Sequence, residues 1–177
     1  MSRVVVCGSL NMDVIAQSAC RPVAGETILD ATVSLLPGGK GANQAIAAAK
    51  LGASVVMVTK VGDDMFADNT IRNLASFGVD TKHVQRVPGR SSGVAPIMVE
   101  PSGENSILIV KGANNDLTPA DIERAAEDLK SCDLILLQLE IPVETVYAAI
   151  DFGKRHGVKT LLNPAPAVAD LDPKRIH

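Results

Sequence analysis

The sequence is poor in aromatic residues. It has no Trp, one Tyr and three Phe, so aromatic side chains make up 2% of the chain. Few platforms are therefore available for stacking nucleic-acid bases, and the Trp and Tyr belts of membrane interfaces are missing. Strong charge is missing as well, because the formal net charge is −3 and the Lys and Arg residues are scattered. The composition predicts neither a nucleic-acid-binding protein nor a membrane protein.

Long apolar runs and paired cysteines are also lacking. No segment approaches the ~20 apolar residues of a membrane span, and the run Val4–Cys7 is too short for a signal peptide. The cysteines, Cys7, Cys20 and Cys132, are odd in number and form no C-x-x-C pattern. We therefore expect free thiols in a reducing cytoplasm.

What the sequence does contain is a regular alternation of apolar strands and helices. Of its 177 residues 46% are apolar, enough for one domain with a sizeable core. The alternation predicts the α/β class, an open, Rossmann-like parallel sheet flanked by helices. The expected strands are 3–7, 54–60, 133–139 and 158–162, and the expected helices are 39–51, 65–77, 118–130 and 143–156.

Two further pairs of strands fall outside this series. Segments 14–18 and 28–36 predict a loose antiparallel pair, and segments 94–99 and 105–110 predict a β-hairpin. Pro96 is expected to keep its strand away from the centre of a sheet, because Pro has no N–H to donate. We expect these strands, inserted at about 13–37 and 92–111, to form a small separate sheet that acts as a flap over a site.

Polar residues gather where the predicted central strands end. In an open parallel sheet, ligands bind beyond the carboxyl ends of the strands. The glycine-rich start of the 39–51 helix lies on the same edge, and its backbone N–H groups are expected to be free for an oxygen-rich ligand. The residues delivered by the strand ends are Asn11, Asp13, Gly62, Asp63, Glu140 and Asn163.

Five of the residues on this edge predict a site for a polyhydroxylated ligand. Asn11, Asp13, Lys40, Asn43 and Glu140 offer two carboxylates, two amides and a cation, and a sugar hydroxyl both donates and accepts. An unmatched hydroxyl costs about 1–3 kcal/mol, which gives sugar specificity. Taken singly, Asn11 and Asp13 can be turn residues, Lys40 a solvated helix end and Glu140 a helix N-cap. Taken jointly, we favour a binding site.

Other kinds of site fit these motifs less well. The stretch Gly38-Gly39-Lys40-Gly41 has neither Walker A spacing nor the Gly-x-Gly-x-x-Gly fingerprint, so a Rossmann oxidoreductase is disfavoured. Asp63 or Asp64 is interpreted as a helix cap rather than a metal ligand, because no third ligand is nearby. Ser91-Ser92-Gly93 is interpreted as a strand-entry turn rather than a phosphate nest. We assign no metal-binding residue.

Several motifs resemble those of the ribokinase-like (PfkB) carbohydrate kinases. The stretch Gly38-Gly39-Lys40-Gly41-Ala42-Asn43-Gln44-Ala45, followed by Gly52 and Gly62, is similar to the N-terminal signature of that family. The likeness runs the whole length of the chain, and segments 61–70 and 91–96 look more like its deoxyribokinase branch. Further matching stretches are Gly8-Ser9-Leu10-Asn11-Met12-Asp13, Pro22-Val23-Ala24-Gly25-Glu26-Thr27, Gln138-Leu139-Glu140 and Asn163-Pro164-Ala165-Pro166-Ala167.

The resemblance implies a kinase that uses ATP and Mg²⁺ to phosphorylate the 5-hydroxyl of D-ribose, and it allows a monovalent cation. It also implies a small β-sheet lid that forms a homodimer. It leaves 2-deoxyribose open as the substrate, because Met12 would fill the space of a missing 2-hydroxyl. By matching position, the sugar would be held by Asn11, Asp13, Gly39, Lys40, Asn43 and Glu140, and covered by Ala95 and Ile97.

Two motifs of that family are not in this sequence. The Asn-x-x-Glu motif near magnesium and the Gly-Ala-Gly-Asp loop with the general base belong to the C-terminal part of its members. We therefore expect residues 1–177 to be the N-terminal part of such a domain, with the catalytic aspartate beyond residue 177. Two alternatives stay open, a kinase for another sugar or a nucleoside, and a non-catalytic sugar-binding or dimerisation fragment.

Overall fold

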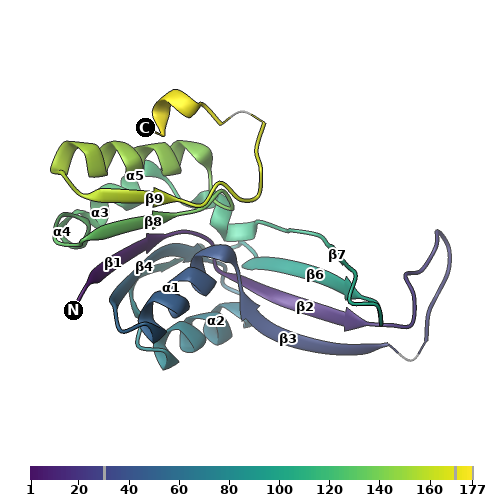
Figure 1. Cartoon of the computed structure of the whole chain (residues 1–177). Helices are drawn as coiled ribbons and strands as arrows, with labels where there is room; N and C mark the ends of the chain where they lie inside the picture. Colours follow the sequence, from purple (N-terminus) through teal and green to yellow (C-terminus); the bar gives the residue numbers. More distant parts are fainter. Residues whose placement is uncertain (30, 170, 177) are drawn as a thin grey trace.

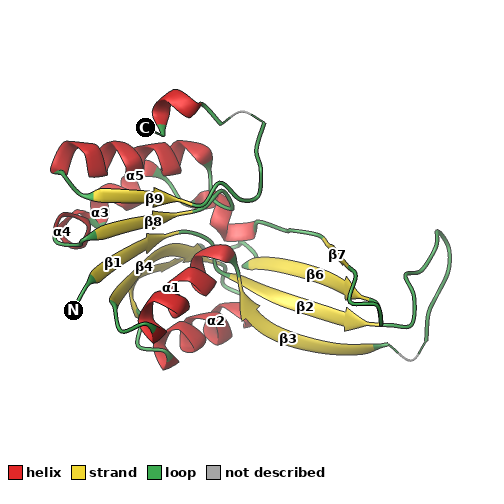
Figure 2. Cartoon of the chain, in the orientation of Figure 1, coloured by secondary structure: helices red, strands yellow, loops and turns green. Residues whose placement is uncertain are grey.

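The computed structural model describes residues 1–29, 31–169 and 171–176, and consists of a body that carries a narrow extension (Figure 1). The body is a five-stranded parallel sheet in the order β5-β4-β1-β8-β9, flanked by helices. The extension is a four-stranded mixed sheet in the order β3-β2-β6-β7, called the small sheet below (Figure 2). The predicted α/β class with a separate small sheet is confirmed.

The chain enters and leaves the small sheet twice. The strands of the body are β1 (Arg3–Cys7), β4 (Ser54–Val61), β5 (Asp80–Arg86), β8 (Leu134–Leu137) and β9 (Lys159–Leu162). The strands of the small sheet are β2 (Asn11–Gln17), β3 (Thr32–Gly38), β6 (Gly93–Val99) and β7 (Asn105–Ile107). The helices are α1 (Lys40–Lys50), α2 (Met65–Ser76), α3 (Pro119–Arg124), α4 (Ala126–Lys130) and α5 (Val143–His156), with 3-10 turns η1 (Gly112–Asp116) and η2 (Pro173–Arg175).

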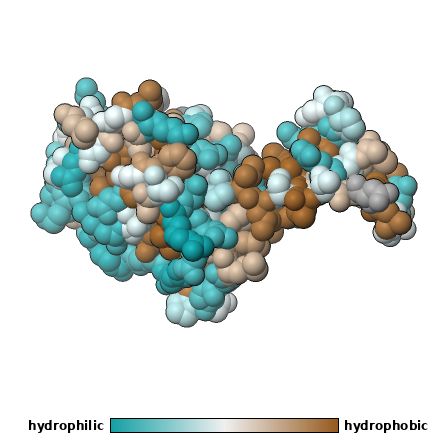
Figure 3. All heavy atoms as spheres, turned by 90° about the horizontal axis from the view of Figure 1, so that it is seen from below, coloured by the Kyte–Doolittle hydropathy of each residue, from teal (hydrophilic) through white to brown (hydrophobic). Residues whose placement is uncertain are grey.

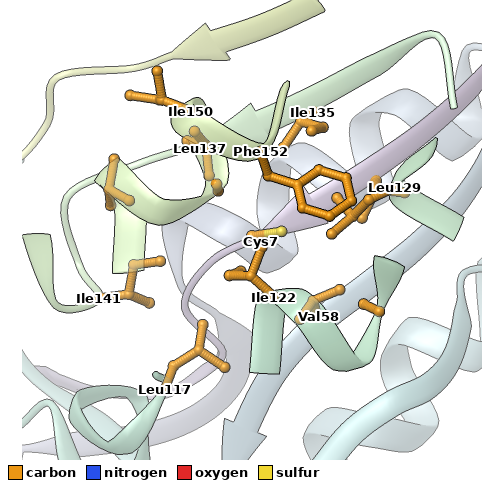
Figure 4. Close-up of a cluster of buried hydrophobic side chains, with 14 of the residues drawn as sticks. Cys7, Val58, Leu117, Ile122, Leu129, Ile135, Leu137, Ile141, Ile150 and Phe152 are labelled. Atoms are coloured by element: carbon orange, nitrogen blue, oxygen red, sulfur yellow. The ribbon is translucent and has the colours of Figure 1, made fainter. Parts of the chain in front are cut away.

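The central strands of the body bury both faces. On β1, Val5 and Cys7 point into a core shared with α3, α4 and α5, whereas Val4 and Val6 point into a second core shared with α1 and α2. Figure 4 shows the first of these cores, which contains both Cys7 and Phe152. Residues that alternate between two covered faces must all be apolar, which explains why the run Val4–Cys7 contains no polar residue.

The position of Pro96 corrects a prediction. Its strand, β6, lies between β2 and β7 rather than at an edge of the small sheet. The Pro96 carbonyl accepts a hydrogen bond from the Leu108 N–H at 2.9 Å, but Pro cannot donate one in return. Strand β7 therefore ends at Ile107, instead of at 110, and the pairing resumes only as an isolated bridge between Val94 and Val110.

Two other differences concern the body. Strand β5 was not predicted, because its segment Asp80–Arg86 is mostly polar, as suits a strand at the edge of the sheet. The single helix expected over 118–130 is two helices separated at Ala125. There the backbone N–H is shared between the carbonyls of Asp121 and Ile122, which is the tightening typical of a 3-10 turn.

The small sheet leaves much of its apolar surface uncovered. Figure 3 shows apolar side chains gathered along the extension. Val33 is 69% exposed and Leu108 65%, whereas the apolar residues of β1 are at most 7% exposed. Within the described part of the chain, no helix has the length and apolar character needed to cross a membrane.

Candidate functional site

A cavity of about 220 Å³ lies where the small sheet joins the body. All eight residues predicted to form the site line it, so the structure brings together side chains from β2, α1, β6 and the loop after β8. Two further residues, Ile107 and Ile109, line the same cavity. The lining residues are Asn11, Asp13, Gly39, Lys40, Asn43, Ala95, Ile97, Ile107, Ile109 and Glu140.

Strand β2 supplies the first two polar residues. Asn11 and Asp13 are two positions apart, so their side chains leave the same face of the strand. Met12 points to the opposite face, where it is buried and lines a different groove with Leu35 and Asn69. The expectation that Met12 fills space beside a sugar is therefore wrong, because a strand sends neighbouring side chains to opposite faces.

The start of α1 forms the floor of the cavity. Gly39 precedes the helix with a φ of 93°, a conformation that favours glycine. The first helical N–H groups are not free, which corrects the prediction. Lys40 N–H donates to Glu140 Oε2 at 3.0 Å, Gly41 N–H to Ser9 Oγ at 3.2 Å, and Ala42 N–H to the Ser9 carbonyl at 2.9 Å. A ligand at this helix start must therefore be bound mainly by side chains.

Glu140 is fixed by two partners. It follows β8 in the loop before α5 and is 7% exposed. Its Oε2 accepts from the Ser9 hydroxyl at 2.5 Å as well as from the Lys40 N–H. The residue at the N-cap of α5 is Pro142, so the alternative that Glu140 caps this helix is wrong. A carboxylate held by two donors on the helix side keeps a defined position at the cavity wall.

Asp13 is a half-buried carboxylate that lies near Glu140. Burial, and secondarily the nearby Glu140, raise the pKa of Asp13 above its ordinary value. The carboxylates of Asp13 and Glu140 repel each other. A ligand group that donates hydrogen bonds to Asp13 replaces part of the hydration that the Asp13 carboxylate has lost. Such a pair favours a neutral ligand rich in hydroxyl groups over an anionic one.

The remaining wall of the cavity is apolar. Ala95, Ile97 and Ile107 lie on the same face of the small sheet as Asp13, because β2, β6 and β7 pair in register. Ile107 and Ile109 were not predicted, although the alternation in segment 105–110 places them together on one face. An apolar wall opposite a polar floor suits a ring that has carbon–hydrogen bonds on one side and hydroxyls on the other.

Other residues from the predicted strand ends lie outside this cavity. The Gly62 N–H donates to Ser92 Oγ, and an Asp63 carboxylate oxygen accepts from the Gly89 N–H. Asn163 N–H donates to the Leu137 carbonyl. Gly62, Asp63 and Asn163 thus form hydrogen bonds within the protein that fix the loops at the strand ends.

Asp64 confirms the capping interpretation. Its side chain accepts from the N–H groups of Phe66 and Ala67 at the start of α2, and also from the N–H and hydroxyl of Ser92. Hydrogen bonds from Ser92 and the two helical N–H groups outweigh desolvation and lower its pKa. In the described part of the chain, no three His, Cys, Asp or Glu side chains come together as metal ligands.

Comparison with known proteins agrees with this arrangement. Residues 1–175 match the pfkB family of carbohydrate kinases. The chain belongs to this family. The predicted resemblance to carbohydrate kinases is thereby confirmed.

Relatives within the family include enzymes named for two pentoses. The chain is 59% identical to the deoxyribokinase of Salmonella typhi over 169 residues, and 47% identical to the ribokinase of Bacillus subtilis over 167 residues. These alignments cover 96% and 94% of the chain but 55% and 57% of the relatives. The chain thus spans about half the length of the curated relatives it matches.

Solved structures confirm the fold. The ribokinase of Arabidopsis thaliana, in a complex with ribose and ATP, superposes with a TM-score of 0.83 at 32% identity. It is matched over 99% of this chain and 57% of its own length. The five-stranded sheet with a small mixed sheet is therefore the arrangement of a ribokinase-like protein.

Proposed function

We propose that this chain provides the sugar-binding half of a kinase that transfers phosphate from ATP to the 5-hydroxyl of D-ribose. The observation that carries the proposal is the cavity in which two carboxylates, two amides and a lysine face an apolar wall. A volume of about 220 Å³ suits a monosaccharide rather than a nucleotide. Residues 1–177 would then be the N-terminal part of a ribokinase-like domain, and the small sheet, inserted at about 13–37 and 92–111, would be its lid.

Each lining residue receives a role in this proposal. Asp13 and Asn11 bind adjacent hydroxyls of the sugar, because a carboxylate accepts and an amide both donates and accepts. Glu140 and Lys40 bind further hydroxyls from the body, with Asn43 beside them on α1. Gly39 lets the backbone approach the ring, and Ala95 and Ile97 cover its apolar side. Ile107 and Ile109 extend that cover.

A second candidate substrate is 2-deoxyribose. Identity to the Salmonella typhi deoxyribokinase is 59%, against 47% to the Bacillus subtilis ribokinase, and this difference favours the deoxy sugar. The pairing of Asn11 with Asp13 favours ribose, because two adjacent polar side chains match two adjacent hydroxyls. Since Met12 faces away from the cavity, it does not discriminate between the sugars.

Ligand-induced thermal shifts test the proposal. A ligand that binds only the folded chain raises its stability by RT ln(1 + [L]/Kd), about 2.7 kcal/mol at a hundred times Kd. Ribose or 2-deoxyribose should raise the melting temperature, whereas fructose and adenosine should not. Asp13→Ala should abolish the shift, and Asp68→Ala, at a carboxylate 70% exposed on α2, should preserve it. A pentose shift retained by Asp13→Ala would refute the site.

ATP and Mg²⁺ would act with residues other than those lining this cavity. The described residues present no cluster of acidic or imidazole ligands for Mg²⁺, and the Gly-Ala-Gly-Asp loop is not in the sequence. We therefore assign no catalytic base and no transfer step to this chain. In a coupled assay of ADP release with ribose and 2-deoxyribose, the 177-residue chain should turn over negligibly. Robust turnover would overturn this assignment.

The small sheet is proposed to pair two copies of the chain. Leu36 is 52% exposed and Ile107 is 53% exposed. Both lie on the face that also carries Asp13, so this face has apolar surface that a second copy can bury. Sedimentation equilibrium should show a dimer that Leu36→Glu dissociates. Leu51→Glu, at a residue 89% exposed on the body, is the control and should leave the dimer intact. A monomeric wild-type chain would refute the pairing.

We propose a cytoplasmic location for the protein. Its three cysteines are free, and Cys20 is exposed, which fits a reducing compartment that also supplies ATP.

A further inference from the structure

Asn114 lies at the junction between the two sheets, just behind the cavity. It belongs to η1, where the chain returns from the small sheet to the body, and its side chain is buried. Its Oδ1 accepts from the Leu10 N–H at 2.9 Å. Its Nδ2 donates to the Leu10 carbonyl at 3.3 Å and to Asn11 Oδ1 at 2.7 Å. One buried amide thus contacts the last residue before β2 and the first residue of β2.

The direction of these hydrogen bonds is dictated by the backbone. A backbone N–H only donates, so the group that faces Leu10 N–H must be the Asn114 oxygen. The Asn114 nitrogen must then face Leu10 O and Asn11. Because an amide nitrogen only donates, Asn11 must turn its oxygen toward Asn114. The Asn11 NH₂ group is left on the other side, and Asn11 lines the cavity.

We propose that Asn114 is a positioning residue that makes Asn11 a hydrogen-bond donor toward the ligand. This inference rests on the proposed sugar site and specifies its chemistry. Asp13 and Glu140, when ionised, only accept hydrogen bonds. A ligand hydroxyl that donates to Asp13 needs a donor for its own lone pair, and the Asn11 NH₂ supplies it. If the Asn11 amide were reversed, the ligand would face three hydrogen-bond acceptors, namely Asn11 Oδ1 and the carboxylates of Asp13 and Glu140, with no donor among them.

The two amides are packed closely against β6. Gly93, the first residue of β6, packs against both of them, and a Cβ at this position would overlap Asn11 Oδ1 and Asn114 Nδ2. The first residues of β2 and β6 and the return through η1 therefore meet at this pair of amides. The hydrogen bond from Asn114 to Asn11, which lies where the two sheets join, therefore also sets the orientation of the Asn11 amide.

The deciding measurement is hydrogen exchange of side-chain amides by NMR in the ligand-free 177-residue chain. The Asn114 NH₂ should exchange slowly, since it donates to two protein oxygens, and the Asn11 NH₂ should exchange faster. An Asn11 NH₂ as protected as that of Asn114 would overturn the proposal. This comparison needs no ligand and no variant, so it holds even if the chain binds no pentose, an outcome that would instead refute the proposed function.

Two matched variants extend the test to binding. Asn114→Asp keeps an acceptor for the Leu10 N–H but cannot donate to Asn11, so the Asn11 amide should reverse and its NH₂ become protected. Affinity for ribose or 2-deoxyribose, measured by calorimetry, should fall about tenfold or more. Asn115→Asp makes the same charge change one residue away at an exposed position and should alter neither quantity. Equal affinities of the two variants would overturn the inference. If Asn114→Asp does not fold, the wild-type exchange rates decide.

Discussion

The two sheets of this molecule both contain many apolar residues but differ in what covers them. In the body, Ile135 and Leu137 on β8 are fully buried beneath helices. In the small sheet, Leu36 and Ile107 are 52% and 53% exposed, so the described helices leave these side chains uncovered. The body therefore carries most of the stability of the fold, whereas the small sheet keeps apolar surface available for a ligand or a partner. The candidate site lies where the two meet.

The largest expected difference between the sheets is in the cost of removing a leucine. Leu137→Ala should lower the free energy of unfolding by about 2–5 kcal/mol, because it leaves a cavity in the core of the body. Leu108→Ala removes the same atoms from a side chain that is 65% exposed and should cost less than about 0.5 kcal/mol. Urea denaturation measures both. Similar losses of stability in the two variants would show that Leu108 is buried as deeply as Leu137 in solution.

The next effect concerns a carboxylate buried in the body. Lys60 Nζ lies 2.7 Å from Asp121, and the Thr118 N–H also donates to it at 2.8 Å. Burial alone would raise the pKa of Asp121, but these hydrogen bonds and that of Arg124 outweigh it and lower the pKa to about 2. Asp121→Asn should cost about 3 kcal/mol at pH 7, because it leaves Lys60 without its ionised partner.

The sign of the pH dependence follows from that direction. The ionised Asp121 stabilises the fold above its ordinary pKa of 3.8, and this stabilisation is lost as the pH falls toward about 2. Urea denaturation at a series of pH values should show this loss in the wild type and a smaller one in Asp121→Asn. An identical acid dependence in both proteins would contradict the assignment.

Asp13, at the junction with the small sheet, should behave in the opposite way. Its pKa is raised by burial and then by Glu140, so the folded state favours the protonated form. Its contribution to stability is present at low pH and lost as the pH rises above the ordinary value. Asp13→Asn should therefore keep or raise the stability at pH 7, by up to about 1 kcal/mol, while losing the pentose-induced thermal shift. A clear destabilisation would show that Asp13 serves the fold.

Most of the body was predictable from the sequence because its signals are local. The run Val4–Cys7, the alanine-rich α1 and the stripe of α5 each carry their own pattern, and their bounds agree with the structure to within a few residues. Strand β5 gave no such signal, because it is a mostly polar segment that forms a strand by pairing with β4 at the edge of the five-stranded sheet. The break at Ala125 likewise has no local marker.

The candidate site was predictable in its residues but not in the hydrogen bonds that hold them. Motif resemblance and strand ends together located eight of the ten residues that line the cavity, and missed Ile107 and Ile109. The partners of those residues come from far along the chain. Ser9 reaches Glu140 across 131 positions, and Asn114 reaches Asn11 across 103. Such contacts depend on the packing of the two sheets, which a single sequence does not display.

The smallest effect is expected at Pro96, which interrupts the pairing of β6 with β7. Pro96→Val supplies an N–H opposite the Leu108 carbonyl, so the hydrogen-bonded ladder should continue from Ile107 to the bridge at Val94 and Val110. The gain of one hydrogen bond, about 1 kcal/mol, is offset by the greater freedom of the unfolded chain, so global stability should change little. Backbone hydrogen exchange should show a protected amide at position 96 and slower exchange in β7. Pro101→Val, in the turn between these strands, serves as the control. An unprotected amide at position 96 would mean that something other than the missing donor ends β7.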